Sequence, residues 1–170
     1  MEIQKATSEN SETICSIGRK SFLSSHGKSA SKEEIDTFIL EHYNPGTISK
    51  ELSNPINNYF LLFQNSNPLG FSNLQLNNSH SYLSFKNVAK LDRIYFLEET
   101  YGKGFGAELL KHNIEFSIKH KQKGIWLFTW VENDRAVNFY RKFGFKIIGK
   151  HNYKISKTHT NPNHIMYLEH

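Results

Sequence analysis

The chain has 170 residues, of which 38% are hydrophobic and 14% aromatic, and its formal net charge is +5. This length suits one domain with a real core, and the apolar content excludes a disordered chain. Lysine and arginine are scattered apart from a short cluster at 119–123, so a basic solvated surface is favoured over a nucleic-acid-binding stripe. We therefore expect a single domain over residues 1–167 that binds no nucleic acid, and we interpret residues 168–170 as a purification-tag remnant.

The single cysteine, Cys15, excludes an intramolecular disulfide and a multi-cysteine metal site. It lies near Ile14 and Ile17 on a predicted helix, so a buried, inert thiol is favoured over a nucleophile. No segment approaches the roughly 20 apolar residues of a membrane span, and the N-terminus is unlike a signal peptide. The default expectation is a cytoplasmic protein without a membrane partner.

Helices dominate the first third of the chain, and strands follow. The capping-box pattern Ser31-Lys32-Glu33-Glu34 marks one helix start, and Asn44-Pro45-Gly46 marks its end. The expected elements up to residue 87 are, in chain order, a strand at 3–6, a helix from Ser8 to about Phe22, a polar loop at 24–29, helices at 31–43 and 47–53, strands at 59–64 and 69–76, and a polar connection at 77–87.

The rest of the chain alternates strands and helices. The long central helix is expected to bury a stripe of Leu109, Leu110, Ile114 and Ile118. The expected elements are a strand at 88–97, a helix at about 104–121, a strand at 125–131, a helix from residue 133 or 134 to Gly144, a strand at 145–149, a polar loop at 151–162 and a last strand at 163–168. We infer an α+β domain without internal repeats.

A glycine-rich turn between the strand ending at Leu97 and the central helix carries the chemistry. Gly102, Gly104 and Gly106 remove side chains that would keep a ligand from the backbone, and Lys103 adds a cation. The following helix N-terminus leaves N–H groups unpaired and carries partial positive charge, so a phosphate-bearing ligand is favoured. A purely structural turn is the alternative, and the spacing fits neither a P-loop nor a dinucleotide fingerprint.

Two segments together resemble the GNAT superfamily of N-acetyltransferases. The first is Ile94–Leu97 with the loop Tyr101–Ala107, and the second is Asn133-Asp134-Arg135-Ala136-Val137-Asn138-Phe139-Tyr140 followed by Gly144-Phe145. The family pattern has Gln or Arg where this chain has Tyr101, which puts that side-chain contact in doubt. More narrowly, Leu91–Tyr95, Ile125–Leu127 and Asn163–Met166 look like the PaiA-like acetyltransferases, which are linked to acetylation of spermidine and spermine.

The resemblance implies a fold and a co-substrate. The fold would be the GNAT acetyltransferase fold, an α/β/α arrangement with a mixed, mostly antiparallel sheet and a splayed strand pair. The co-substrate would be acetyl-CoA, with no metal. Its implied binding residues are Ile94, Tyr95 and Phe96 on a strand edge, Gly102, Lys103, Gly104, Phe105, Gly106 and Ala107 in the loop, and the side chain of Asn133. On the residues alone, the strand could equally be ordinary core, and Asn133 could equally be a helix N-cap.

Tyr140 and Asp92 are the catalytic candidates. Tyr140 lies seven residues after Asn133, about two helical turns, so both are expected on one face. A phenol there could protonate the departing CoA thiolate, although an aromatic at that spacing is more often core. Asp92 is expected to share a strand face with Ile94 and Phe96 and to act as base, against a structural carboxylate paired with Arg93. Further candidates are Glu98, Glu132 and Asp134.

The first hypothesis is direct acetyl transfer to a primary amine, with a polyamine as the favoured acceptor and no acyl-enzyme. Acidic residues of the second helix could receive a polycation, although a solvated face explains them as well; they are Glu33, Glu34, Asp36 and Glu41. A protein N-terminus or lysine is the rival acceptor, and a homodimer is compatible with the sequence. The rival class is a non-catalytic acetyl-CoA-binding regulatory module, and a phosphotransferase ranks last. The spacing of His151, His159 and His164 fits no metal site.

Overall fold

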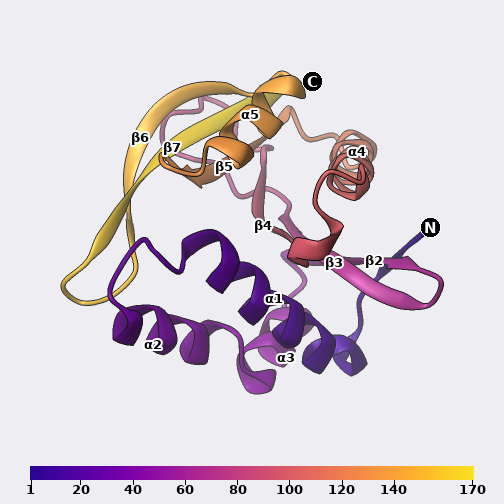
Figure 1. Cartoon of the computed structure of the whole chain (residues 1–170). Coiled ribbons are helices and arrows are strands. Elements are labelled where there is room, and N and C mark those ends of the chain that lie inside the picture. The colour runs from indigo at the N-terminus through magenta and orange to yellow at the C-terminus, as the bar shows by residue number, and fades with distance from the viewer.

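The computed structural model describes residues 1–170 as one seven-stranded sheet with helices on both faces (Figure 1). The strand order is β1-β2-β3-β4-β5-β7-β6, and every neighbouring pair is antiparallel except β4 and β5. The strands are β1 (Glu2–Lys5), β2 (Asn57–Gln64), β3 (Asn67–Gln75), β4 (Ala89–Phe96), β5 (Gly124–Trp130), β6 (Lys146–Lys154) and β7 (Thr160–Glu169). The helices are α1 (Ser11–His26), α2 (Lys32–His42), α3 (Pro45–Ser53), α4 (Phe105–Lys119) and α5 (Asp134–Lys142). The expected α+β class and mixed sheet are confirmed.

Local sequence signals set most helix starts. Ser31 and Glu34 form the predicted capping box of α2, and the side chain of Asn44 accepts from Thr47 N–H, with Pro45 in the first turn of α3. The predicted start of the polar loop at residue 24 is wrong, because α1 continues through Ser24 and Ser25 to His26. This extra turn carries His26 to the site described below.

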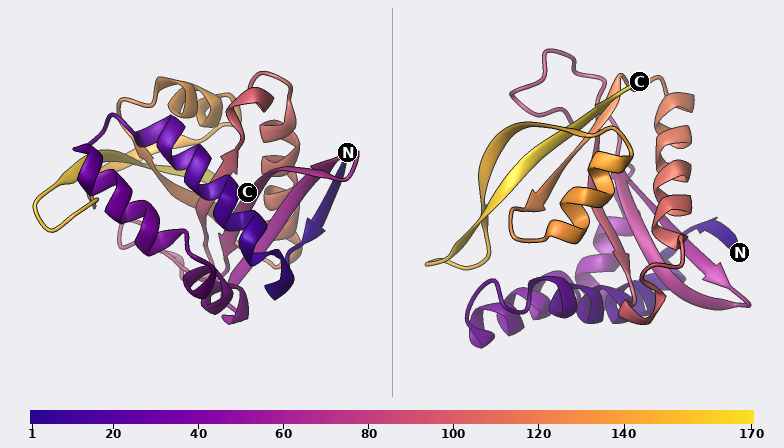
Figure 2. Two further views of the ribbon diagram at one scale, coloured as in Figure 1. Left: turned by 60° about the horizontal axis from the view of Figure 1, so that its bottom comes forward. Right: turned by 45° about the horizontal axis from the view of Figure 1, so that its top comes forward.

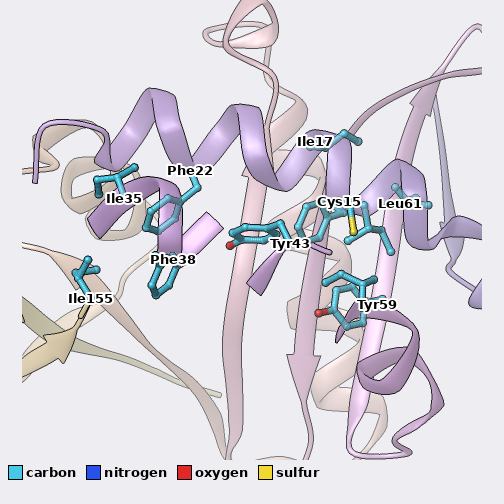
Figure 3. Close-up of a cluster of buried hydrophobic side chains, with 12 residues drawn as sticks. Cys15, Ile17, Phe22, Ile35, Phe38, Tyr43, Tyr59, Leu61 and Ile155 are labelled. Carbon is cyan, nitrogen blue, oxygen red and sulfur yellow. The ribbon is translucent and has the colours of Figure 1, made fainter. Parts of the chain in front are cut away.

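The helices divide into two groups that cover opposite faces of the sheet. The helices α1, α2 and α3 share one apolar cluster with β2 and β3, in which Tyr43 and Tyr59 are almost fully buried. Figure 3 shows this cluster beneath α1, with Tyr43 between the Phe22–Phe38 pair and Cys15. The helices α4 and α5 pack on the other face through a second cluster that includes Leu110.

The helix α4 buries Leu109 and Leu110 and partly buries Ile114, as expected, but not Ile118. Ile118 is 52% exposed, whereas Asn113 and Ser117, which lie four and eight residues after Leu109, are fully buried. Asn113 Nδ2 donates to Ser72 Oγ at 2.9 Å and to the Leu109 carbonyl at 2.7 Å, so its burial leaves that amide paired. Hydrophobicity alone could not predict a polar residue on the buried face.

The strands β4 and β5 separate soon after they begin. They pair in parallel only at Ala89 with Ile125 and at Lys90 with Trp126. Beyond these pairs, β4 stays bonded to β3 and β5 stays bonded to β7. The splayed pair implied by the family resemblance is therefore present.

The strands β6 and β7 form a long hairpin where a polar loop over 151–162 was expected. The prediction is wrong because β6 is largely exposed, so its residues lack the apolar alternation that marks a half-buried strand. Figure 2 shows the hairpin reaching beyond the sheet toward the turn between α1 and α2. There Ser156 Oγ donates to Glu34 Oε1 at 2.5 Å, and Asn161 Nδ2 donates to Ser29 Oγ at 2.8 Å.

The expected domain end at residue 167 falls inside β7. Leu168 pairs with Ile125, and Glu169 pairs with Gly124. His170 also contacts the fold, because its backbone N–H donates to the Lys123 carbonyl at 3.1 Å. None of the helices combines the length and apolarity that a membrane crossing requires.

Candidate active site

A cavity of about 470 Å³ opens where β4 and β5 diverge. Its lining falls into two groups of residues: the glycine loop with α5, and the C-terminal part of α1 with the end of β5 and the β6–β7 hairpin. We call these the loop end and the α1 end. Most of the candidate residues line this cavity: Asp92, Ile94, Tyr95, Phe96, Gly102, Gly104, Phe105, Gly106, Ala107, Asn133 and Tyr140.

The glycine loop presents unpaired main-chain donors to the loop end. The N–H groups of Gly102, Gly104, Phe105 and Gly106 take part in no backbone hydrogen bond. Gly102 and Gly104 have φ values of +76° and +85°, and a Cβ added at either would meet nothing within 4 Å. The positive φ values explain why glycine is needed, and the open space leaves room for a bound anion.

Two residues of the predicted loop set differ from the rest. The Ala107 N–H is already engaged, since it donates to the Gly104 carbonyl at 3.0 Å. Lys103 is exposed and does not line the cavity. The N–H groups available to a ligand are therefore fewer than the full set from Gly102 to Ala107.

A cation from α5 lies against the residue that departs from the family pattern. The Arg135 guanidinium carbon is 3.6 Å from the centre of the Tyr101 ring, and both side chains line the cavity. This cation–π contact holds a positive charge beside the glycine loop. Sequence reasoning missed Arg135, because the contact joins two segments that are 34 residues apart.

The edge of β4 that faces β5 is free next to the loop. Ile94, Tyr95 and Phe96 pair with Ser72, Phe71 and Gly70 of β3, and they have no partner on β5. Their side chains pack in the core while the backbone borders the cavity. A ligand with amide groups can pair with such an edge as an added strand would.

Asn133 and Tyr140 both line the cavity, as their two-turn spacing predicts. Asn133 is the N-cap of α5, and its Oδ1 accepts from Ala136 N–H at 3.1 Å. Tyr140 is 8% exposed, and none of the side-chain hydrogen bonds involves its hydroxyl. Burial, and then the neighbouring Tyr95 phenol, raise the pKa of Tyr140, so it stays protonated at neutral pH.

Asp92 lies in the cavity but not on the expected strand face. A β-bulge shifts the register, with Asn73 opposite Arg93 and Leu74 opposite Leu91, so Asp92 has no partner on β3. Because of this extra residue, Asp92 does not share a face with Ile94 and Phe96. Its carboxylate instead contacts Lys90 Nζ at 2.6 Å and Arg93 Nε at 3.6 Å. Burial alone would raise the pKa of Asp92, but the charges of Lys90 and Arg93 outweigh it and lower the pKa.

The other candidate groups lie elsewhere. Glu98 accepts from Ser24 Oγ at 2.9 Å, and neither Glu98, Glu132 nor Asp134 lines the cavity. Cys15 is 1% exposed, lies outside the cavity, and has a pKa raised by burial. No group of three His, Cys, Asp or Glu side chains is placed to hold a metal ion.

Sequence reasoning also missed the aromatic lining of the α1 end. His26 stacks on Phe22, with ring centres 4.7 Å apart, and lies 5.8 Å from the Trp130 ring. Burial lowers the pKa of His26 to about 4, so the ring is neutral at pH 7. The signal that could have located it was the continuation of the α1 pattern through Ser24 and Ser25.

The sequence matches one family profile. Residues 19–145 match the Acetyltransferase (GNAT) family. The chain belongs to the GNAT acetyltransferases. It is therefore an N-acetyltransferase whose co-substrate is acetyl-CoA.

Individual GNAT relatives cover nearly the whole chain. A spermidine N(1)-acetyltransferase from Thermoplasma acidophilum is 29% identical over 154 residues, which are 86% of this chain and 89% of the relative. An uncharacterized N-acetyltransferase from Lactobacillus delbrueckii subsp. lactis is 22% identical over 89% of this chain and 87% of its own length. The crystal structure of the PaiA N-acetyltransferase from Thermoplasma acidophilum in complex with coenzyme A superposes with a TM-score of 0.80. This structure is 25% identical and covers 99% of this chain and 98% of its own.

Proposed function

We propose that this GNAT enzyme transfers the acetyl group of acetyl-CoA directly to a small primary amine in the cavity between β4 and β5. The observation that carries the proposal is the continuity of that cavity. It joins the unpaired N–H groups of the glycine loop, the free edge of β4 and the Tyr140 side chain. These are the groups that a diphosphate, an amide-bearing arm and a leaving thiolate need, in that order along one ligand.

The cofactor half of the proposal assigns each part of CoA to a group of matching chemistry. The diphosphate is held by the N–H groups of Gly102, Gly104, Phe105 and Gly106 at the N-terminus of α4. Arg135, held against Tyr101, adds positive charge beside the loop, where the family pattern has the polar side chain of Gln or Arg. The two amides of the pantetheine arm pair with the backbone of Ile94–Phe96. The side-chain Nδ2 of Asn133, which its capping hydrogen bond does not use, can donate to the CoA arm. The exposed Lys103 adds long-range electrostatic attraction for the phosphates of CoA.

The chemical step requires one proton to be lost and one to be gained. The neutral amine nitrogen attacks the thioester carbonyl, an N–C bond forms, the C–S bond breaks, and the nitrogen gives up its proton. The electron pair of the broken bond stays on sulfur, Tyr140 donates its phenolic proton to that thiolate, and the proton that the nitrogen loses after its attack returns through water to the Tyr140 phenolate. We infer no acyl-enzyme, because Cys15 is buried outside the cavity.

Asp92 is the proposed proton acceptor, because it supplies the carboxylate in the lining. Its lowered pKa makes it a weak base. We therefore expect the amine to lose its first proton readily on entering an apolar site, which lowers an amine pKa, with Asp92 receiving it through water.

A polyamine is the acceptor to test first, because a relative that is 29% identical is a spermidine N(1)-acetyltransferase. The acidic residues of α2 give this choice little support. Glu34 bonds Ser31 and Ser156, Asp36 pairs with Lys32, and none of the four predicted carboxylates lines the cavity. A protein N-terminus or lysine remains the rival acceptor. A non-catalytic CoA-binding module would not need the room and the carboxylate at the α1 end.

The test is release of CoA thiol from acetyl-CoA over a panel of polyamines, N-terminal peptides and other primary amines. Tyr140→Phe should lower kcat by about two orders of magnitude, the usual effect of a general acid, with the Kd for CoA within about twofold. Tyr82→Phe is the matched control, because Tyr82 is 59% exposed and lies outside the cavity. Equal losses in kcat and CoA affinity would remove Tyr140 from the acid role. Silence across the panel, with CoA still bound, would favour the non-catalytic module.

A further inference from the structure

The α1 end of the cavity is walled by aromatic rings from three separate elements. Phe22 and His26 project from α1, Phe128 and Trp130 from the end of β5, and Tyr153 from β6. The Phe128 and Tyr153 ring centres are 6.1 Å apart at 69°, and those of His26 and Trp130 are 5.8 Å apart at 30°. His26, Phe128, Trp130 and Tyr153 are only half-buried, although His26 stacks on Phe22 and Phe128 stacks on His151, with ring centres 4.4 Å apart.

The carboxylates in and beside the cavity lining are already paired with cations. Lys90 contacts Asp92 at 2.6 Å, and Arg93 donates to both carboxylate oxygens of Glu51, at 2.6 and 3.1 Å. Arg135 and Lys142 are the other charged residues in the lining, and both are cations of α5. A second ammonium group on the acceptor would find no unpaired carboxylate here, and burying an unpaired charge is strongly unfavourable.

One polar side chain of the wall has no partner. Asn163 of β7 is 7% exposed and lines the cavity, yet neither end of its carboxamide bonds the protein, and its Oδ1 is buried. Buried amides are normally paired, so an unpaired carboxamide in this wall is unusual, although its buried Oδ1 does not face the open cavity. Asn163 lies opposite Trp130 in the β5–β7 ladder, beside the aromatic wall.

From the aromatic wall and the paired carboxylates we infer that the acceptor is an arylalkylamine, a primary amine joined by a short alkyl chain to an aromatic ring. The ring packs among Phe22, His26, Phe128, Trp130 and Tyr153, and the amine reaches the splay between β4 and β5. Such an acceptor brings one ammonium group, and that group becomes neutral before it attacks. A polyamine would keep one or more positive charges in a wall without a free carboxylate. This inference rests on the proposed function and names the substrate class of the same site.

The test compares kcat/KM for 2-phenylethylamine, n-hexylamine and spermidine at saturating acetyl-CoA, with CoA thiol release as the readout. We expect 2-phenylethylamine to exceed both other amines by about tenfold or more, since ring packing adds to apolar burial. Trp130→Ala should lower kcat/KM for 2-phenylethylamine by about tenfold, through KM, and for n-hexylamine by about threefold or less. Phe85→Ala is the matched control, because Phe85 is 45% exposed and lies outside the cavity.

Each outcome separates the inference from the proposed function. Spermidine turnover that equals or exceeds that of 2-phenylethylamine would overturn the arylalkylamine assignment and leave the acetyltransferase mechanism standing. Equal losses for 2-phenylethylamine and n-hexylamine in Trp130→Ala would also overturn it, because the ring would then make no special contact. Turnover of no amine, with CoA binding intact, would overturn both.

Discussion

Replacing Gly104 by alanine separates the strain of the glycine loop from its proposed use. Gly104 has a φ of +85°, and a Cβ there would meet nothing within 4 Å, so the substitution adds backbone strain without a clash. The left-handed conformation costs alanine roughly 1–2 kcal/mol, which should lower the Tm by about 2–8 °C in a protein of this size. The new methyl group would also occupy open space beside the Phe105 and Gly106 N–H groups. If one charge-assisted hydrogen bond to a phosphate is lost, CoA affinity should fall about tenfold to hundredfold.

Gly144→Ala provides the matched control. Gly144 has a φ of +90°, and its added Cβ would make an ordinary 3.5 Å contact with Leu168 Cδ1, away from the cavity. The strain is the same, so the Tm should fall by a similar amount, whereas the Kd for CoA measured by calorimetry should not change. If Gly104→Ala binds CoA as tightly as the parent, or if both variants weaken binding equally, the phosphate assignment of the loop is wrong.

Three further predictions follow from the charges. Arg135→Gln should weaken CoA binding about threefold to thirtyfold by removing a charge-assisted contact, with the loss shrinking at high salt in calorimetric titrations; an affinity independent of Arg135 would exclude it from the phosphate site. The pKa of His26 is lowered to about 4, so its neutral form contributes stability that is complete above pH 6.5 and lost as the pH falls through 4. The melting temperature of His26→Gln should therefore depend less on pH across that window, and an unchanged dependence would contradict the burial of a neutral ring. Hydrogen bonds from Ser156 and then Ser31 lower the pKa of Glu34 to about 2. The stability that Glu34 contributes is present above about pH 4.5 and lost as the pH falls toward 2. The Tm deficit of Glu34→Gln at pH 7 should disappear in acid, and a deficit that persists at pH 2 would contradict the ionic origin.

Short-range patterns predicted the positions of the loop glycines, Asn133 and Tyr140 beside the cavity. The positive-φ glycines, the Asn133 cap and the Tyr140 position two turns later all follow from residues close together in the chain. Their geometry is fixed by helix periodicity and turn chemistry, which a sequence displays directly. The order of strands and helices was predictable for the same reason.

The acceptor end was much less predictable, because it depends on contacts between distant segments. The alternation of side chains between the two faces of β4 is interrupted at Asp92, because a β-bulge places its carboxylate next to Lys90 and Arg93. Nothing in the local pattern marks a bulge. His26 was assigned to a loop because serines precede it, although the helix continues and places its ring 5.8 Å from the ring of the distant Trp130.

The polar loop expected at 151–162, where the β6–β7 hairpin lies, was wrong for a third reason. Its residues face solvent on most positions, so the alternation that reveals a strand is missing. The strand is held by its neighbour β7 and by its tip, where His159 Nε2 donates to the Ser29 carbonyl at 2.7 Å. These hydrogen bonds join residues more than a hundred positions apart, so local sequence patterns could not predict them.

The loop end of the cavity is formed mainly by main-chain atoms and the α1 end mainly by side chains, and this difference bears on how the two ends can change during evolution. The loop end relies on main-chain atoms from one continuous stretch, which most side-chain substitutions leave in place. The α1 end relies on side chains, and the hairpin that supplies Tyr153 and Asn163 is tied by hydrogen bonds to Ser29 and Glu34. Under the proposed function, changes in these side chains or in the hairpin ties would alter the fit of an incoming amine and leave the main-chain cradle in place. Acceptor preference would then drift during evolution while the binding of the acetyl donor is retained.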